Sequence, residues 1–241
     1  MKLARMPDGS PEIFHTLQGE GRNTGRPAVF IRASLCNLHC QWCDTPYTWN
    51  WDDTSFEHEK SVKFSRENEI VDLTAEDIAK EVSQYPCSHF VLTGGEPLLQ
   101  EKGWLELINR LPGSFEAETN GTLLPSPEFL EKVEQINVSP KISNSGITKE
   151  KRINPDVLTA LSQLEKVDFK FVIGTSEDFD EVKNLAEEFR LVPDRVFLMP
   201  KAATPDELNA RQARVADLAQ QNGFRYSDRL HLRLYGAKRG T

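Results

Sequence analysis

Three of the four cysteines in this 241-residue chain lie within eight residues, in the segment Cys36-Asn-Leu-His-Cys40-Gln-Trp-Cys43. Thiolates at this CxxxCxxC spacing can converge on one metal centre from a single loop. A 4Fe–4S cluster normally takes four cysteine ligands, so three leave one iron open to bind a substrate or cofactor. We therefore expect Cys36, Cys40 and Cys43 to hold a 4Fe–4S cluster with one open iron.

Two other metal centres are compatible with these cysteines. Structural zinc takes four ligands in paired spacings, but the sequence holds no second pair, and His39 lies awkwardly between two of the ligands. A closed four-cysteine cluster would need Cys87. That residue precedes the candidate strand His89–Thr93, whereas the triplet follows the candidate strand Ala28–Arg32, so roughly 16 Å of strand separates the two ends. We expect Cys87 to be a small, partly or fully buried residue instead.

Six short runs rich in Val, Ile and Phe alternate with helical patterns and predict strands. These runs are Ala28–Arg32, His89–Thr93, Phe115–Thr119, Ile136–Ser139, Val167–Ile173 and Arg195–Met199. The helical segments are Thr74–Tyr85, Trp104–Leu111, Pro127–Val133, Pro155–Leu164, Asp178–Phe189 and Asp206–Gln221. Strands that alternate with helices pair in parallel. We predict an α/β fold, a partial (β/α)6 TIM-like barrel, with a doubly wound sheet as the alternative; in both, the active site lies at the carboxyl ends of the strands.

The stretch Trp49–Asp72 interrupts this alternation and is longer than a normal connection. Its charged residues are mostly acidic. We interpret it as an insertion after the cluster loop. It is either a solvated surface segment or a lid or docking surface beside the active site.

The bulk composition is that of an ordinary globular protein, and we expect a single domain over residues 1–241. With 29 basic and 37 acidic residues the formal net charge is −8, which disfavours nonspecific nucleic-acid binding because phosphate neutralisation needs surplus Lys and Arg. No apolar run approaches the ~18–20 residues that span a bilayer. The N-terminus lacks the apolar core of a secretory signal. We expect a cytoplasmic protein with no nucleic-acid or membrane partner.

Two further motifs follow other predicted strands. Thr93-Gly94-Gly95-Glu96-Pro97 allows close backbone approach at its glycines and could accept hydrogen bonds from an ammonium group, although alone it reads as a turn. Ser139-Pro140-Lys141 alone is a plain loop. Together with CxxxCxxC and Trp42, these motifs resemble the radical S-adenosylmethionine superfamily. The resemblance implies that S-adenosylmethionine contacts Trp42, Cys43, Asp44, Gly95, Glu96, Ser139, Pro140 and Lys141.

A longer set of segments resembles the 7-carboxy-7-deazaguanine synthase family. The segments are residues 14–21 (FHTLQGEG), 27–32 (PAVFIR), 44–45 (DT), 93–97 (TGGEP), 118–121 (ETNG), 139–141 (SPK) and 230–241. The resemblance implies a carbon–nitrogen lyase that converts 6-carboxy-5,6,7,8-tetrahydropterin to 7-carboxy-7-deazaguanine with loss of ammonia, in queuosine or deazapurine biosynthesis. It also implies a homodimer and a reductant protein such as flavodoxin or ferredoxin. The alternatives are another radical enzyme, such as a glycyl-radical activase, and a non-catalytic iron–sulfur carrier.

The residue types in these segments suit a pterin substrate that carries a carboxylate. Arg32 can pair bidentately with a carboxylate. A surface salt bridge is the alternative, but an arginine after an apolar run and just before the cluster loop is better placed for a ligand. Thr45 can offer a hydroxyl to Mg²⁺. The resemblance implies substrate contacts at Leu17, Gln18, Gly19, Glu20, Arg32, Thr93, Glu118 and His231. Of these, Glu20 could instead cap a turn, and a lone histidine such as His231 is more often structural.

Overall fold

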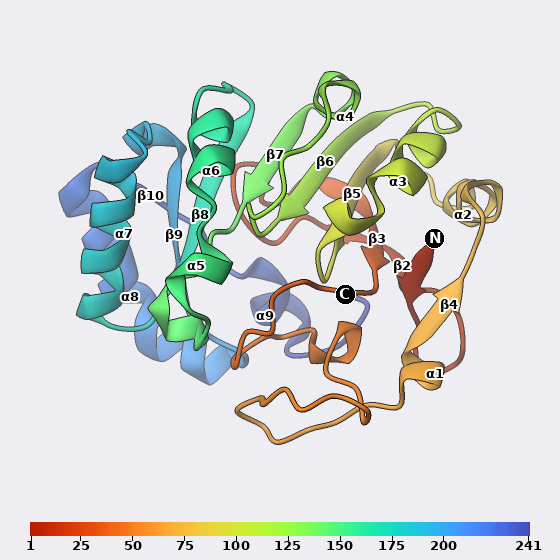
Figure 1. Ribbon diagram of the computed structural model, residues 1–241, viewed down its shortest axis with the longest axis horizontal. Coiled ribbons are helices and arrows are strands. Elements are labelled where there is room, and N and C mark those ends of the chain that lie inside the picture. The colour runs from red at the N-terminus through yellow and green to blue at the C-terminus, as the bar shows by residue number, and fades with distance from the viewer.

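The computed structural model describes all 241 residues and is built on one mixed ten-stranded sheet (Figure 1). The six predicted strands are present and pair in parallel, in chain order. They are β3 (Pro27–Ala33), β5 (His89–Gly94), β6 (Ser114–Thr119), β7 (Gln135–Val138), β8 (Val167–Ile173) and β9 (Val196–Pro200). A doubly wound sheet reverses its strand order at a switch point. This order never reverses, so the doubly wound alternative is wrong.

The predicted helices connect these strands and cover one side of the sheet. They are α2 (Ala75–Val82), α3 (Glu101–Ile108), α4 (Pro127–Lys132), α6 (Pro155–Ser162), α7 (Ser176–Glu188) and α8 (Pro205–Asn222). Figure 1 shows them following one another around the outside of the curved sheet. Thr74 caps α2 through a capping box, in which its side chain accepts from the Asp77 amide. The apolar core lies between sheet and helices and includes Trp104, Phe129 and Phe169.

Several elements escaped the sequence analysis because they are short. Antiparallel strands β1 (Lys2–Ala4), β2 (Ile13–Leu17) and β4 (Ile70–Asp72) extend the sheet beyond β3, and β10 (Arg225–Tyr226) pairs in parallel with β9. The remaining helical pieces are α1 (Arg66–Glu69), α5 (Lys149–Arg152), α9 (Leu230–Tyr235) and the 3₁₀ turns η1 (Pro46–Thr48), η2 (Pro97–Gln100), η3 (Ser143–Ser145) and η4 (Pro193–Arg195). The sheet is open, with β10 and β4 at its two ends.

The β2–β3 loop crosses the space inside the curved sheet near the amino ends of the strands. The register pairs Leu17 with Pro27, so the loop leaves β2 beside the amino end of β3. Asn23 then donates to Glu116 on β6 at 2.6 Å, and Arg22 pairs with Asp168 on β8 at 2.5 Å. The loop is therefore tied across the interior by polar side chains near the amino ends of the strands.

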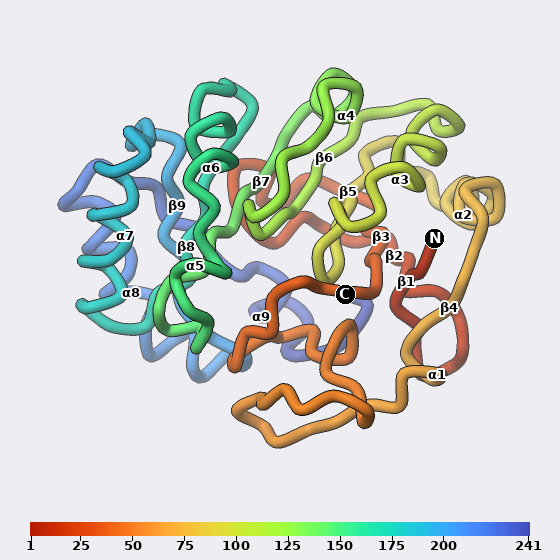
Figure 2. The backbone as a smooth tube through the Cα atoms, in the orientation of Figure 1, coloured from red at the N-terminus to blue at the C-terminus, as the bar shows by residue number.

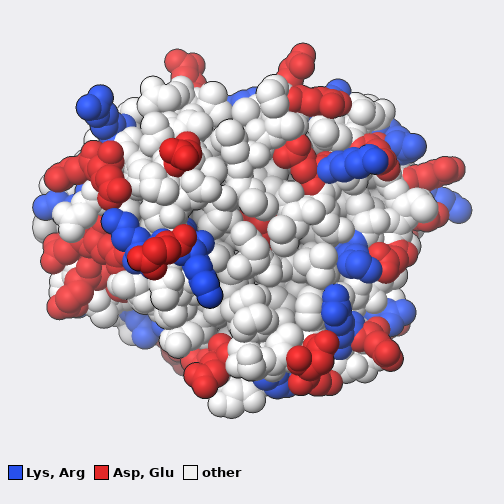
Figure 3. Space-filling view, in the orientation of Figure 1, with Lys and Arg blue, Asp and Glu red and all other residues white.

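The insertion Trp49–Asp72 forms the lower edge of the molecule in Figure 2, where it is drawn in orange. Its final residues become the edge strand β4, and a bridge joins Trp51 to Phe64. None of the helices combines the length and apolar composition that a membrane crossing requires. On the face in Figure 3, charged side chains lie mostly around the periphery, and acidic groups gather where α7 lies.

Candidate active site

A cavity of about 320 Å³ lies at the carboxyl ends of the parallel strands, a volume in the range of small-molecule sites. All of the predicted site residues except Glu96 and Pro140 line it. These lining residues are Leu17, Gln18, Gly19, Glu20, Arg32, Cys36, Cys40, Trp42, Cys43, Asp44, Thr45, Thr93, Gly95, Glu118, Ser139, Lys141 and His231. The fold thus brings together segments that are more than 200 residues apart in the chain.

The three cysteines of the triplet face this cavity from the loop after β3. Burial raises the pKa of each thiol, that of Cys40 to about 12, so a metal must displace the proton before the thiolate forms. Cys43 Sγ accepts from Trp49 Nε1 at 3.4 Å. No three His, Cys, Asp or Glu side chains converge closely enough to hold a single ion. A cubane does not need the thiols to converge on one ion, because each thiolate there binds a different iron.

The alternative fourth ligands lie elsewhere. Cys87 Sγ is 3.5 Å from the carbonyl of Pro27 and 3.7 Å from that of His89, at the amino ends of β3 and β5. The closed-cluster interpretation is therefore wrong, since the triplet lies at the opposite edge. The ring of His39 stacks on Phe56, with centroids 3.4 Å apart, and this packing leaves the zinc interpretation without its fourth ligand.

The glycine motif after β5 packs directly against the cluster loop. A Cβ atom on Gly95 would lie 2.2 Å from the carbonyl oxygen of Leu35 and 2.9 Å from Cys36 Cβ, so only glycine fits there. Glu96 is fully buried and does not line the cavity. Its carboxylate accepts from Leu98 N, Thr119 Oγ1 and Asn120 N at 3.0, 2.8 and 2.7 Å. These three hydrogen bonds hold the loop after β5 in place, and the predicted contact of Glu96 with S-adenosylmethionine stays a prediction.

The Ser139–Lys141 segment and Trp42 form the wall opposite the glycine motif. Lys141 Nζ donates to Ser139 Oγ at 3.0 Å and lies 5.7 Å from the centre of the Trp42 ring. Trp42 Nε1 donates to the carbonyl of Asn144 at 2.9 Å, which fixes the ring. Lys201 approaches the same ring at 5.8 Å. Pro140 lies outside the lining, so a contact through it would run only through the neighbouring residues.

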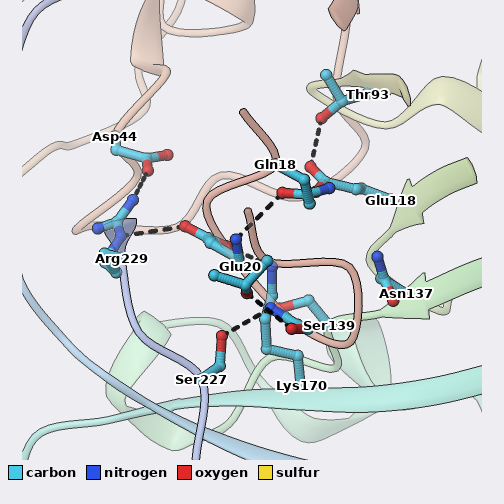
Figure 4. Close-up of polar contacts among 12 residues, drawn as sticks. Gln18, Glu20, Asp44, Thr93, Glu118, Asn137, Ser139, Lys170, Ser227 and Arg229 are labelled. Atoms are coloured by element: carbon cyan, nitrogen blue, oxygen red, sulfur yellow. Dashed lines mark hydrogen bonds and ion pairs between the residues drawn. The ribbon is translucent and has the colours of Figure 1, made fainter. Parts of the chain in front are cut away.

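Gln18, for which the resemblance implies a substrate contact, is hydrogen-bonded within the protein through its side chain and its backbone. Its Nε2 donates to Glu116 at 2.7 Å and to Glu118 at 3.3 Å, and its Oε1 accepts from the Glu20 amide at 3.1 Å (Figure 4). Its backbone N–H and C=O bond to Arg26 and Gly25. Gln18 therefore shapes the loop and leaves ligand contacts to its neighbours.

Burial and neighbouring charges shift the pKa values of two cavity carboxylates in opposite directions. Burial alone would raise the pKa of Glu20, but the ammonium of Lys170 and the guanidinium of Arg229 outweigh burial and hold that pKa well below its usual range. Burial raises the pKa of Glu118, which accepts from Thr93 Oγ1 at 2.8 Å. Glu20 stays ionised, whereas Glu118 takes up a proton more readily, a pattern typical of catalytic pairs.

Arg32, Thr45 and His231 complete the set of predicted residues. Arg32 Nε donates to the buried Glu12 at 2.7 Å, and its two terminal nitrogens make no hydrogen bond within the protein. Thr45 Oγ1 lies 3.6 Å from Cys43 Sγ. Burial lowers the pKa of His231, so its imidazole is neutral near pH 7, and its Nδ1 lies 2.5 Å from where a Cβ on Gly19 would be. The free end of Arg32 suits a carboxylate ligand.

Comparison with known proteins fits this geometry. The profile of the Radical SAM superfamily matches residues 31–220. The 7-carboxy-7-deazaguanine synthase of Pyrobaculum aerophilum is 37% identical over 233 residues, covering 95% of each chain. That of Halobacterium salinarum is 34% identical, covering 93% of this chain and 89% of the relative. The chain belongs to the 7-carboxy-7-deazaguanine synthase family. It is a radical enzyme whose cofactors are a 4Fe–4S cluster and S-adenosylmethionine.

Solved structures support membership of the synthase family. QueE from Escherichia coli superposes with a TM-score of 0.64 at 25% identity, covering 96% of this chain and 95% of that one. SuiB from Streptococcus suis, bound to S-adenosylmethionine, shares the fold at a TM-score of 0.51 and 13% identity, and this chain covers 49% of it. The comparisons favour the synthase over the activase and over the iron–sulfur carrier.

Several cavity residues of this synthase-family chain were missed from sequence. They are Asn137, Lys170, Lys201, Arg211 and Arg229. Lys170 could have been identified from the sequence, because a lysine inside the apolar run Val167–Ile173 has to reach a buried partner. Arg229 could not have been identified in this way, because its partners Glu20 and Asp44 are distant in sequence.

Proposed function

We propose that this chain converts 6-carboxy-5,6,7,8-tetrahydropterin to 7-carboxy-7-deazaguanine with release of ammonia, in the biosynthesis of queuosine and related deazapurines. The observation that carries the proposal is the cavity itself, where the cysteine loop faces a carboxylate-binding arginine and the ionised Glu20. An activase cavity needs no such pair. The family membership supports the same reaction.

The proposed roles follow from the contacts in the cavity. Bound at Cys36, Cys40 and Cys43, the cluster and S-adenosylmethionine would supply the 5′-deoxyadenosyl radical that removes a hydrogen atom beside the substrate carboxylate. The unpaired end of Arg32 holds that carboxylate. Glu20 accepts from ring N–H groups, and Glu118, Thr93 and His231 line the far side of the ring. The main chain of Leu17 and Gly19 supplies further contacts.

The cofactor side is proposed on the same grounds. Lys141, Ser139 and Trp42 contact S-adenosylmethionine together with Asp44 and Gly95, while Glu96 and Pro140 act by holding the loops that carry those groups. Mg²⁺ binds at the hydroxyl of Thr45, beside the substrate carboxylate. A flavodoxin or ferredoxin delivers the electron.

The wider organisation is also a proposal. Residues 1–241 act as a single domain, since one apolar core runs from β1 to α8. The monotonic order of the parallel strands supports the partial (β/α)6 barrel. The enzyme works as a cytoplasmic homodimer and needs no nucleic acid or membrane.

The test is anaerobic incubation of reconstituted enzyme with the tetrahydropterin, S-adenosylmethionine, Mg²⁺ and dithionite, followed by mass spectrometry. We expect a deazaguanine product and ammonia in equal amounts. Absence of this product, or formation of deoxyadenosine only when a protein partner is added, would reject the synthase reaction.

A further inference from the structure

Arg229 joins three parts of the cavity wall that are far apart in the sequence. Its Nε donates to Glu20 on the β2–β3 loop at 3.2 Å, one terminal nitrogen pairs with Asp44 on the cluster loop, and the other donates to the carbonyl of Ala202 after β9. Figure 4 shows the guanidinium between the two carboxylates. The Arg229 side chain is 9% exposed, so the guanidinium itself is largely shielded from bulk water.

The Asp44 end of this bridge belongs to the cofactor side. Asp44 lies between Cys43 and Thr45 in the chain. Its carboxylate is half exposed because it faces the open cavity. A ligand that enters beside the cluster loop therefore meets a carboxylate whose position is set by Arg229.

The Glu20 end belongs to the pterin side. Glu20 also pairs with Lys170 from β8, so it keeps one cation when Arg229 is absent. The residue after Arg229 continues the contact, because Leu230 N donates to the carbonyl of Gly19 at 3.0 Å. The β2–β3 loop and the segment that begins α9 are thus joined by contacts at two successive residues.

A guanidinium is planar and rigid. When it shifts with one carboxylate, its hydrogen-bond geometry to the other carboxylate therefore changes. We propose that Arg229 is a positioning residue that couples S-adenosylmethionine binding at the cluster loop to pterin binding at the Glu20 loop. This inference rests on the proposed function, which assigns the pterin to the Glu20 side. Such coupling is reciprocal, so each ligand raises the affinity of the other by the same factor.

The experiment measures the affinity of reconstituted enzyme for S-adenosylmethionine with and without saturating 6-carboxypterin, an oxidised analogue that lacks the hydrogen to be removed. In the unaltered enzyme we expect the analogue to tighten binding about fivefold or more, the usual size of coupling between sites. In Arg229→Met the ratio should fall to about one, with iron content unchanged. Arg229→Lys should lose most of the ratio, because one ammonium cannot hold both carboxylates in the fork geometry.

Arg233→Met is the matched control. Arg233 lies on the same helix, pairs with Asp228 at 2.5 Å and does not line the cavity, so the ratio should persist. If Arg229→Met does not fold, Asp44→Asn tests the same bridge while Arg229 keeps its pairing with Glu20. A ratio that survives in these variants, falls equally in Arg233→Met, or is absent from the unaltered enzyme overturns the inference. Product formation by the unaltered enzyme, measured separately, decides the proposed function.

Discussion

At the residue scale, buried carboxylates hold the cavity in shape because their acceptor sites are filled by the protein itself. Glu116 is fully buried and takes hydrogen bonds from Gln18, Asn23 and Asn137 at 2.7, 2.6 and 2.5 Å, and from His89 at 3.3 Å. It lies beneath the cavity and touches no ligand position. Glu116 therefore fixes the position of Gln18 and of the β2–β3 loop that begins there.

Glu116→Ala should lower the free energy of unfolding by about 3 kcal/mol or more, because three buried amides lose their acceptor. The Michaelis constant for the pterin should rise as the loop loosens. Urea titration and steady-state kinetics measure the two effects. Glu106→Ala, an exposed position on α3, is the control and should change stability by less than about 0.5 kcal/mol. An unaltered midpoint in Glu116→Ala would contradict the expectation.

The four cysteines should divide into two classes. Cys36→Ala, Cys40→Ala and Cys43→Ala should each abolish cluster binding and deoxyadenosine formation, because each removes one iron ligand. Cys87→Ala should keep full iron content, because that thiol lies at the opposite edge of the sheet. Iron assay and anaerobic absorbance spectra measure this. Cluster loss in Cys87→Ala would restore the closed-cluster interpretation.

At the element scale, the loops around the cluster site are in close van der Waals contact with each other. The glycine motif touches the backbone before Cys36, and Leu35 itself adopts a positive φ of 76°. The insertion covers the outer side, where His58 Nε2 lies 2.8 Å from the carbonyl oxygen of Cys43 and Phe56 stacks on His39. The insertion therefore packs against the outer side of the cluster loop.

Gly95→Ala should displace the cluster loop, because the added methyl would overlap the Leu35 carbonyl, and such overpacking costs about 1–3 kcal/mol. Iron content and the response of the cluster to S-adenosylmethionine should both fall. Gly174→Ala, at the carboxyl end of β8, is the control because a methyl there meets only ordinary contacts at 3.6 Å and beyond. Equal iron content in both variants would show that the close approach is not required.

Phe56→Ala should expose the cluster loop to solvent and hasten the loss of cluster absorbance in air. Val62→Ala is matched to it, since Val62 is 38% and Phe56 37% exposed, but Val62 makes no stacking contact with the loop. The measurement is the rate of bleaching after exposure to oxygen. Identical rates would mean that the insertion does not protect the cluster.

At the scale of the whole molecule, sequence reasoning recovered the parallel strands and missed the pieces that close the site. The strands β3, β5 and β8 are long apolar runs, so local composition identifies them. Strands such as β1 and β10 have two or three residues and gain their order only from neighbours. The cysteine and glycine motifs have fixed local spacing, whereas Arg229 gains its role solely from tertiary contacts. The hydrogen bonds of the Gln18 amide to Glu116 and Glu118 likewise form only in the folded chain.

Stability should also depend on His231. Burial lowers its pKa below the ordinary 6.5, so the folded state binds fewer protons than the unfolded state as the pH falls through that value. The stability that the neutral imidazole contributes is present above pH 6.5 and declines below it. The difference in unfolding free energy between the unaltered protein and His231→Gln should therefore shrink from pH 7.5 to about 5.5.

Residues near the end of the sequence form hydrogen bonds with residues near its beginning. Arg239 donates to the buried Glu12 at 2.9 Å, across 227 positions, and Arg229 reaches Glu20 across 209. A nascent chain still on the ribosome can form its strands in order of synthesis, but it lacks these last partners. Both contacts therefore form only after the parallel strands have been synthesised, and a truncation before Arg229 should leave Glu12 and Glu20 without these partners.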